Sequence, residues 1–263
     1  MNEPHPALTY GSYLALDEVL SAQRPRSDEH DEMLFIVIHQ VYELWFKQLL
    51  HEFGHLQQRL EDGDTTHVLH TLKRILTILK VVVAQIDVLE TMTPRQFTSF
   101  RGRLEAASGF QSAQFRELEA VLGRRDQRVF KHYPEGSAAR ERISAAMSRP
   151  SVFDSFLRYL DRQGYRLPAG ALERDVSAPV EASADVQKVL LDVYRDDGEP
   201  AQVAERLVDV DEGLQEWRYR HVKMVERTIG SKPGTGGSAG ARYLRTTLSN
   251  PAFPDLWEIR SEM

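Results

Sequence analysis

Apolar side chains recur every three or four residues along most of the chain, as they do on one face of an α-helix. Runs of β-branched residues that alternate with polar ones, which would indicate strands, are missing, and no internal repeat is visible. The pattern predicts an all-α helical bundle that forms a single domain over residues 1–263. The predicted helices cover approximately residues 8–20, 31–60, 65–91, 93–107, 112–122, 151–162, 184–195 and 201–229.

Local signals mark the ends of several segments. In the run from Thr93 to Gln96, threonine is a good cap, proline suits the first helical position, and glutamine completes a capping box. Residues 123–150 are mixed and charged. Residues 164–184 carry Pro, Gly and Ala and are expected to be a variable, mobile insertion. A glycine-rich turn at 230–240 follows the last long helix.

Composition and charge narrow the classes of protein. Hydrophobic residues make up 41% of the 263 residues and charged residues 27%, as in ordinary globular proteins. The net charge of -6 argues against a nucleic-acid or anionic-membrane partner. No segment approaches the roughly 20 apolar residues of a membrane span, and the start lacks the pattern of a secretory signal. We therefore expect a cytoplasmic protein.

The chain contains no cysteine. This excludes disulfides, zinc sites built from thiolates, iron–sulfur clusters, thioether-attached haem and a cysteine nucleophile. If the protein holds iron in a haem, the axial ligand has to come from His, Tyr or Met.

His221 lies on the apolar stripe of the last long predicted helix. A polar ring on such a stripe needs a partner, because an unpaired buried polar group costs a few kcal/mol. That partner is either a backbone carbonyl or carboxylate, which is the commoner case, or a metal ion. The apolar residues that share the stripe are Val203, Leu207, Val210, Leu214, Trp217 and Met224.

His39 is a second histidine among core residues, on a different predicted helix. Two such histidines are able to face one haem from opposite sides, one as axial ligand and the other as a hydrogen-bonding group. The alternative is a zinc or di-iron site that uses His51, Glu52 and His55. A di-iron bundle site needs two Glu-x-x-His motifs, and the chain has only this one.

Two further features are suited to a small anion such as a carboxylate. The glycine-rich turn matches neither phosphate-binding nor dinucleotide-binding motifs, but it offers exposed N–H groups and the hydroxyl of Thr235. Arg101 follows Phe97 and Phe100, so its planar fork would bind a carboxylate next to an apolar group. The alternatives are a flexible surface loop and an exposed arginine that lies over apolar surface.

Several segments, in this order along the chain, resemble the tryptophan 2,3-dioxygenase family. Together they lie within residues 8–246, nearly the whole chain, and long motifs in register are far more specific than any pair of histidines. The segments are residues 30–40 with 43–47, then 89–94 (LETMTP), 108–112 (SGFQS), 217–221 (WRYRH) and 234–238 (GTGGS).

The resemblance implies a homotetrameric, all-helical haem b enzyme. Such an enzyme inserts both atoms of O2 across the C2–C3 bond of the indole of L-tryptophan and forms N-formyl-L-kynurenine, the first step of the kynurenine route. One alternative is a relative in the same haem superfamily that oxygenates a modified tryptophan in secondary metabolism. Others are a non-catalytic haem or O2-binding protein, and a helical interaction protein without haem.

The resemblance also implies roles for single residues. His221 matches the axial iron ligand, and His39 matches the distal, catalytic histidine that hydrogen-bonds the indole N–H. We expect His39 to orient the substrate rather than to act as an obligatory base. The other matched groups are Arg101 and Thr235 for the substrate's carboxylate and ammonium, Phe35 and Phe97 as pocket walls, and Ser108 over the haem.

Three residues near the start of the chain match a segment that, in the family, closes the pocket of a neighbouring subunit. They are Tyr10, Tyr13 and Leu14. The chain departs from the family at Ala239, where a serine is usual. The loss of this hydroxyl is expected to loosen specificity at the ammonium end of the substrate.

Overall fold

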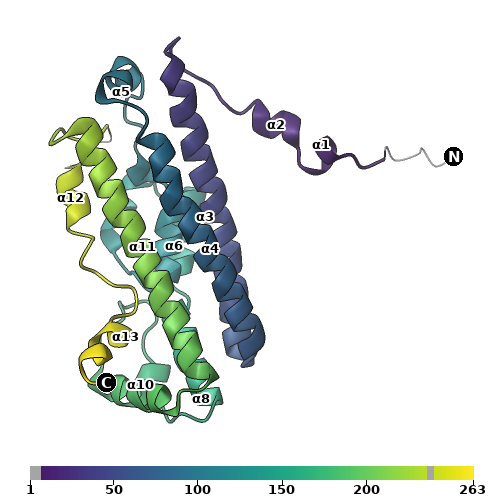
Figure 1. The fold of residues 1–263 in the computed structure, drawn as a ribbon, viewed down its shortest axis with the longest axis vertical. Helices are drawn as coiled ribbons and strands as arrows, with labels where there is room; N and C mark the ends of the chain where they lie inside the picture. The colour runs from purple at the N-terminus through teal and green to yellow at the C-terminus, as the bar shows by residue number, and fades with distance from the viewer. Residues whose placement is uncertain (1–6, 236–239) are drawn as a thin grey trace.

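A computed structural model describes residues 7–235 and 240–263. Three long helices form its body: α3 (His30–Asp62), α4 (Thr65–Leu89) and α11 (Glu199–Ile229) (Figure 1). They lie side by side along most of their length, with α4 in contact with both others. Their apolar stripes pack into one core that includes Leu49, Ile75 and Leu207, all fully buried. The described residues contain helices and turns but no strand, so the all-α prediction is confirmed.

A tight turn reverses the chain between α3 and α4. Gly63 has a φ of 74°, a left-handed conformation that glycine adopts without strain. The Asp64 side chain then caps α4 by accepting from the backbone N–H of His67 at 3.2 Å. This turn makes the two long helices antiparallel neighbours, as the Glu-Asp-Gly-Asp sequence of residues 61–64 indicates.

Shorter helices cover the rest of this core. α6 (Ala113–Val121) and α8 (Val152–Arg162) pack against α3, and α7 (Ala138–Met147) packs against α6. The remaining elements are α1 (Tyr10–Tyr13), α2 (Leu16–Leu20), α5 (Pro94–Arg101), α9 (Ala169–Leu172), α10 (Ala184–Asp196), α12 (Ala241–Arg245), α13 (Pro254–Glu258) and the 3-10 turns Gly109–Gln111, Gln127–His132 and Ile259–Ser261.

The boundaries of the long helices agree with prediction within a few residues, and the capping box of Thr93 with Gln96 is present. The first predicted helix is instead two short ones, because Ala15 has a φ of 49° and interrupts it. The mixed and charged stretch 123–150 contains the ten-residue helix α7. Its buried side consists of only Ile143, Ala146 and Met147. So few apolar positions among charged neighbours give a weak helical periodicity in the sequence.

The stretch 164–184 is attached to α8 and to the chain after α6. Arg174 forms a two-pronged ion pair with the buried Asp154, at 2.6 and 2.8 Å. Arg125 donates to the carbonyl of Val176 at 2.8 Å. That this stretch is a variable, mobile insertion stays a prediction.

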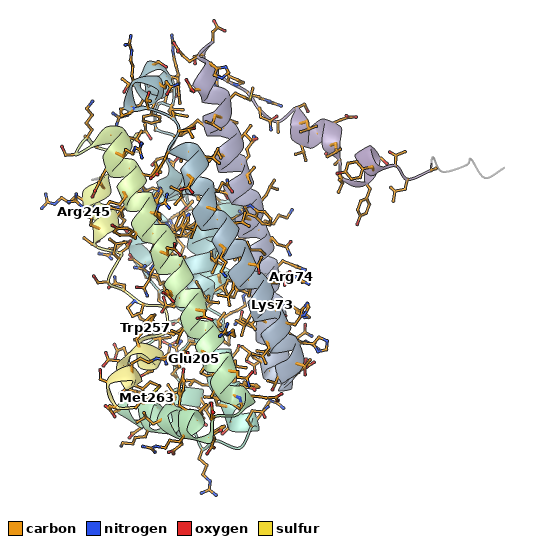
Figure 2. The ribbon with its side chains drawn as sticks, in the orientation of Figure 1. Lys73, Arg74, Glu205, Arg245, Trp257 and Met263 are labelled. Atoms are coloured by element: carbon orange, nitrogen blue, oxygen red, sulfur yellow. The ribbon has the colours of Figure 1, made fainter. Side chains whose placement is uncertain are left out.

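A buried carboxylate attaches the C-terminal segment to α11. Asp211 has no solvent exposure and accepts from the backbone N–H groups of Ala252 and Phe253, at 2.8 and 3.1 Å. It also accepts from the indole N–H of Trp257 at 2.9 Å, and Figure 2 shows this residue on α13 beside the lower half of α11. These bonds hold the chain after α12 against the bundle. None of the helices in residues 7–235 and 240–263 is long and apolar enough to cross a membrane.

Candidate active site

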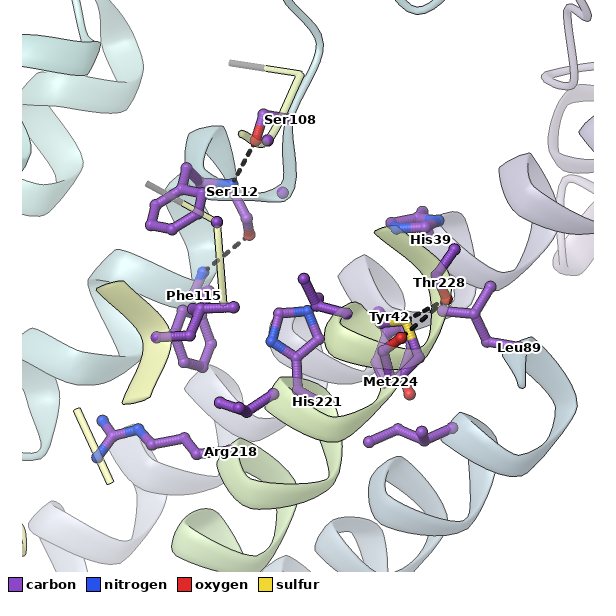
Figure 3. A pocket seen from close by; sticks show the side chains of 18 of the residues that line it. His39, Tyr42, Leu89, Ser108, Ser112, Phe115, Arg218, His221, Met224 and Thr228 are labelled. Carbon is purple, nitrogen blue, oxygen red and sulfur yellow. Dashed lines mark hydrogen bonds between the residues drawn. The ribbon is translucent and has the colours of Figure 1, made fainter. Parts of the chain in front are cut away.

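A cavity opens at the end of the bundle where α5 and α12 lie. It lies between α3, α5, α6, α11 and α12 and is open to solvent; its empty space, solvent at the mouth included, is about 1570 Å³. Both predicted core histidines line it, from two different helices (Figure 3). Its walls are mainly aromatic and aliphatic, and include Phe35, Tyr42, Phe46, Phe97, Phe115, Trp217 and Met224.

His221 projects from α11 into this cavity (Figure 3). Burial, together with the nearby His39, lowers the pKa of its imidazole to about 4, so the ring is neutral at pH 7. The ring lies parallel to that of Trp217, with 5.2 Å between centroids. Within the described part of the chain nothing hydrogen-bonds its ring nitrogens, so a lone pair is available. This is the chemistry of a metal ligand.

His39 projects from α3 into the same cavity. Its Nδ1 donates to the carbonyl oxygen of Phe35 at 2.7 Å, since a carbonyl only accepts. The lone pair is therefore on Nε2, which is free to accept a hydrogen bond. Burial lowers the pKa of this imidazole as well, so it is neutral at pH 7. A neutral acceptor of this kind fits the N–H of a heteroaromatic ring.

Three phenylalanines form an aromatic wall next to His39. The ring centroids of Phe35, Phe97 and Phe100 are 5.5 to 5.7 Å apart, and the ring of Phe35 lies 4.1 Å from that of His39. Tilted and edge-on packing at such distances is typical of aromatic side chains. Phe35 and Phe97 line the cavity, whereas Phe100 is fully buried.

Arg101 and Thr235 meet at the mouth of the cavity. Arg101 Nη2 donates to the carbonyl of Pro233 at 2.5 Å, and the Thr235 hydroxyl donates to the carbonyl of Ala107 at 2.5 Å. These bonds attach the turn after α11 to α5 and to the segment that follows α5. The structure therefore brings together two groups that lie 134 positions apart in the sequence. Residues 236–238 of the glycine-rich motif and Ala239 lie outside the described residues.

Ser108 also lines the cavity, next to the turn that α6 follows. Its hydroxyl accepts from the N–H of Phe110 at 3.4 Å and caps the short 3-10 turn (Figure 3). The sequence SGFQS thus places two serines at successive turns, because Ser112 caps α6 by accepting from Phe115 N–H at 3.2 Å.

Tyr10, Tyr13 and Leu14 do not reach the cavity of their own chain. They lie on or beside α1, and α1 and α2 extend away from the bundle (Figure 1). Their exposed fractions are 76%, 72% and 40%. Such exposure is unusual for three neighbouring large side chains.

The other metal site considered from the sequence is not supported. Glu52 is buried and binds Arg74 at 3.2 Å and Gln48 at 2.6 Å, whereas His51 and His55 are exposed. No cluster of three or more potential metal-ligating side chains occurs in residues 7–235 and 240–263.

Sequence reasoning missed a buried ion cluster at the inner wall. The carboxylate of Glu119 on α6 accepts from Arg116 at 2.7 Å, from Arg218 at 3.0 Å and from Arg124 at 3.4 Å. Glu119, Arg116 and Arg218 all line the cavity. The only signal in the sequence is the place of Arg218 between Trp217 and His221.

The fold and the site define a class of protein: an all-helical chain with two neutral histidines that face one aromatic cavity. Comparison with known proteins specifies the family. The family model for tryptophan 2,3-dioxygenase matches residues 2–164 and 145–263. The chain belongs to the tryptophan 2,3-dioxygenase family.

Relatives from several bacteria are similar along nearly the whole chain. A tryptophan 2,3-dioxygenase of Anaeromyxobacter sp. (strain K) is 69% identical over 98% of this chain and 97% of its own length. One of Herpetosiphon aurantiacus is 56% identical, over 98% and 99%. One of Caulobacter vibrioides is 46% identical, over 97% and 98%.

Proposed function

We propose that the protein is a haem-dependent dioxygenase that cleaves the indole C2–C3 bond of L-tryptophan with O2. The product is N-formyl-L-kynurenine, and the reaction is the first step of tryptophan catabolism by the kynurenine route. The family membership supports this activity. The structural observation that carries the proposal is the pair of neutral imidazoles, His39 and His221, on either side of one aromatic cavity.

His221 is the group that would hold haem b by its iron. A neutral imidazole that has no hydrogen-bond partner among the described residues, in a mainly apolar cavity, would suit an iron ligand. Ferrous haem, when bound, supplies the iron that binds and activates O2. Ser108 lines the cavity, and its hydroxyl would lie next to the haem.

The indole ring is bound by His39 and the aromatic wall. Nε2 of His39 accepts the indole N–H, because Nδ1 is already used in the bond to Phe35. Phe35 and Phe97 pack against the faces of the ring and exclude water. His39 acts here by orientation, since attack of activated oxygen on an electron-rich indole does not require prior removal of the N–H proton.

The two charged groups of the amino acid are bound at the mouth of the cavity. The guanidinium of Arg101 uses one nitrogen on Pro233 and retains donors for the substrate carboxylate. The hydroxyl oxygen of Thr235 donates to Ala107 and still accepts from the ammonium. Both contacts hold the substrate so that its indole reaches His39.

The assembly is part of the proposal. One domain per chain forms a homotetramer, in which Tyr10, Tyr13 and Leu14 of one chain cover the cavity of another. Their exposure in the single chain and the projection of α1 and α2 away from the bundle support this arrangement (Figure 1).

The direct test is a single-turnover experiment. The purified protein is reduced without air, mixed with L-tryptophan and then exposed to oxygen, while N-formylkynurenine is followed by its absorbance and ¹⁸O₂ incorporation by mass spectrometry. We expect a Soret band and a product that carries both oxygen atoms. A haem-free protein, a product with one oxygen atom, or turnover only of a substituted tryptophan would each contradict the proposal.

A further inference from the structure

The ion cluster around Glu119 joins two helices that border the cavity. The side chains of Glu119 and Arg218 are only 10% and 5% exposed, and their Oε1 and Nη2 atoms are 3.0 Å apart. Both oxygens of the carboxylate are used, one by Arg218 and Arg124 and the other by Arg116. One buried carboxylate is thus the common partner of three guanidinium groups.

The cluster acts on α11 one turn before His221. Arg218 Nη1 also donates to the carbonyl of Asn250 at 3.4 Å, so this guanidinium binds α6 and the C-terminal segment together. One turn before the carboxylate on α6, Phe115 packs on Trp217 with 4.9 Å between ring centroids. Trp217 in turn stacks on His221 with an angle of 2° between the ring planes. Two contacts from α6 therefore fix the turn of α11 that carries the histidine.

The imidazole of His221 depends on these contacts for its orientation. Metal-bound histidines usually donate their second ring nitrogen to a carboxylate or carbonyl, which fixes the ring. Here the described residues provide no such bond, and the ring is fixed by its stacking on Trp217 and by the rotation of α11. A small rotation of that turn would move the nitrogen that faces the cavity.

We infer that Glu119 is a positioning residue for His221. By holding Arg218 on α6, it sets the rotation of α11 and so aims the imidazole into the cavity. The inference rests on the proposed haem site. Removal of the carboxylate leaves three guanidinium groups without their anion in a buried place, and their mutual repulsion pushes Arg218 and its turn away from α6.

The test measures how fast haem leaves the protein, by its transfer to excess apomyoglobin. Glu119→Gln keeps the shape and removes the charge, and Arg218→Met removes the other half of the pair. We expect each variant to lose haem about tenfold faster than the parent, with a changed Soret spectrum. The double variant should lose haem no faster than Glu119→Gln alone, because both changes remove the same contact.

The matched control is Glu205→Gln near the other end of α11, where Glu205 binds Arg260 at 2.7 Å. It removes an ion pair of the same helix, and haem loss should stay at the parent rate. Glu119→Asp, which retains the charge, should restore part of the slow rate. If Glu119→Gln does not fold, Arg218→Lys takes its place, since it keeps the charge and loses the fork.

Parent-rate haem loss in Glu119→Gln would overturn the inference. So would an equal acceleration in Glu205→Gln, or single effects that multiply in the double variant. A parent protein that shows no Soret band contradicts the proposed function instead, so the two failures are distinguishable.

Discussion

The two cavity histidines differ in what holds their rings. His39 is fixed by a hydrogen bond to its own helix, through the carbonyl of Phe35. His221 has no such hydrogen bond within the described residues, and its ring is held by stacking on Trp217 and by its helix. One ring therefore presents a defined acceptor, and the other presents an unshared lone pair. This difference agrees with a substrate contact for His39 and an iron ligand for His221.

Replacement of His221 by alanine should abolish haem binding. Among the described lining residues the remaining histidine is His39, which projects from α3 and not from α11, so the cofactor would lose the iron ligand that α11 supplies. The purified variant is expected to show no Soret band while its far-ultraviolet circular dichroism stays helical. A variant with normal haem content would contradict the assignment of the ligand.

Replacement of His39 by alanine should keep the haem and reduce turnover without abolishing it. The variant loses one hydrogen bond to the indole, which is worth about tenfold in kcat/KM. Steady-state kinetics with L-tryptophan measure the effect. An inactive His39→Ala with intact haem and normal substrate affinity would mean that the imidazole is an obligatory base.

The pH dependence follows from the same ring. Protonated His39 is unable to accept the indole N–H, and burial lowers its pKa below the ordinary 6.5. We therefore expect kcat/KM to fall as the pH is lowered, with a midpoint below pH 6.5. A midpoint above pH 6.5 in the parent that disappears in His39→Ala would contradict this expectation.

At the scale of helices, sequence periodicity predicted the long elements well and the polar contacts between them poorly. His39, His221 and Arg101 were found because each follows an apolar pattern within one helix. Glu119 and Asp211 were not found, because a carboxylate on an amphipathic helix is usually exposed. Their partners Arg218 and Phe253 lie 99 and 42 positions away in the chain, and no local pattern reports such a pairing.

Asp211 should be the strongest single polar contribution to the C-terminal segment. Asp211→Ala leaves the N–H donors of Ala252, Phe253 and Trp257, which are buried or partly buried, without their acceptor, and we expect a loss of about 3 to 5 kcal/mol in the free energy of unfolding. Urea denaturation measures it. The control is Asp192→Ala, which breaks an exposed ion pair with Arg195 on α10 and should change stability by less than about 0.5 kcal/mol. Equal effects would refute the role of Asp211.

At the scale of the whole molecule, the exposed tyrosines of α1 predict that chains exchange parts. Tyr10→Ala with Tyr13→Ala should leave the fold and haem content unchanged, because neither ring is buried, and should raise KM for L-tryptophan. Mixing this variant with His221→Ala during refolding should restore activity. In the mixed assembly, Tyr10 and Tyr13 of the haem-free His221→Ala chain cover the haem-containing cavity of the tyrosine variant. If the mixture shows only the average of the activities of the two separate variants, each chain completes its own site.

The hydrogen bonds at the rim have a consequence for selectivity. Before any ligand arrives, Arg101 and Thr235 are already engaged with the carbonyls of Pro233 and Ala107. The remaining donors of Arg101 and the lone pairs of the Thr235 oxygen are thereby held in fixed directions, and only a molecule that bears both a carboxylate and an ammonium binds to both groups. Indole lacks both charges and tryptamine lacks the carboxylate, so neither binds to both groups, and discrimination among indoles begins at the mouth of the cavity, before any chemistry.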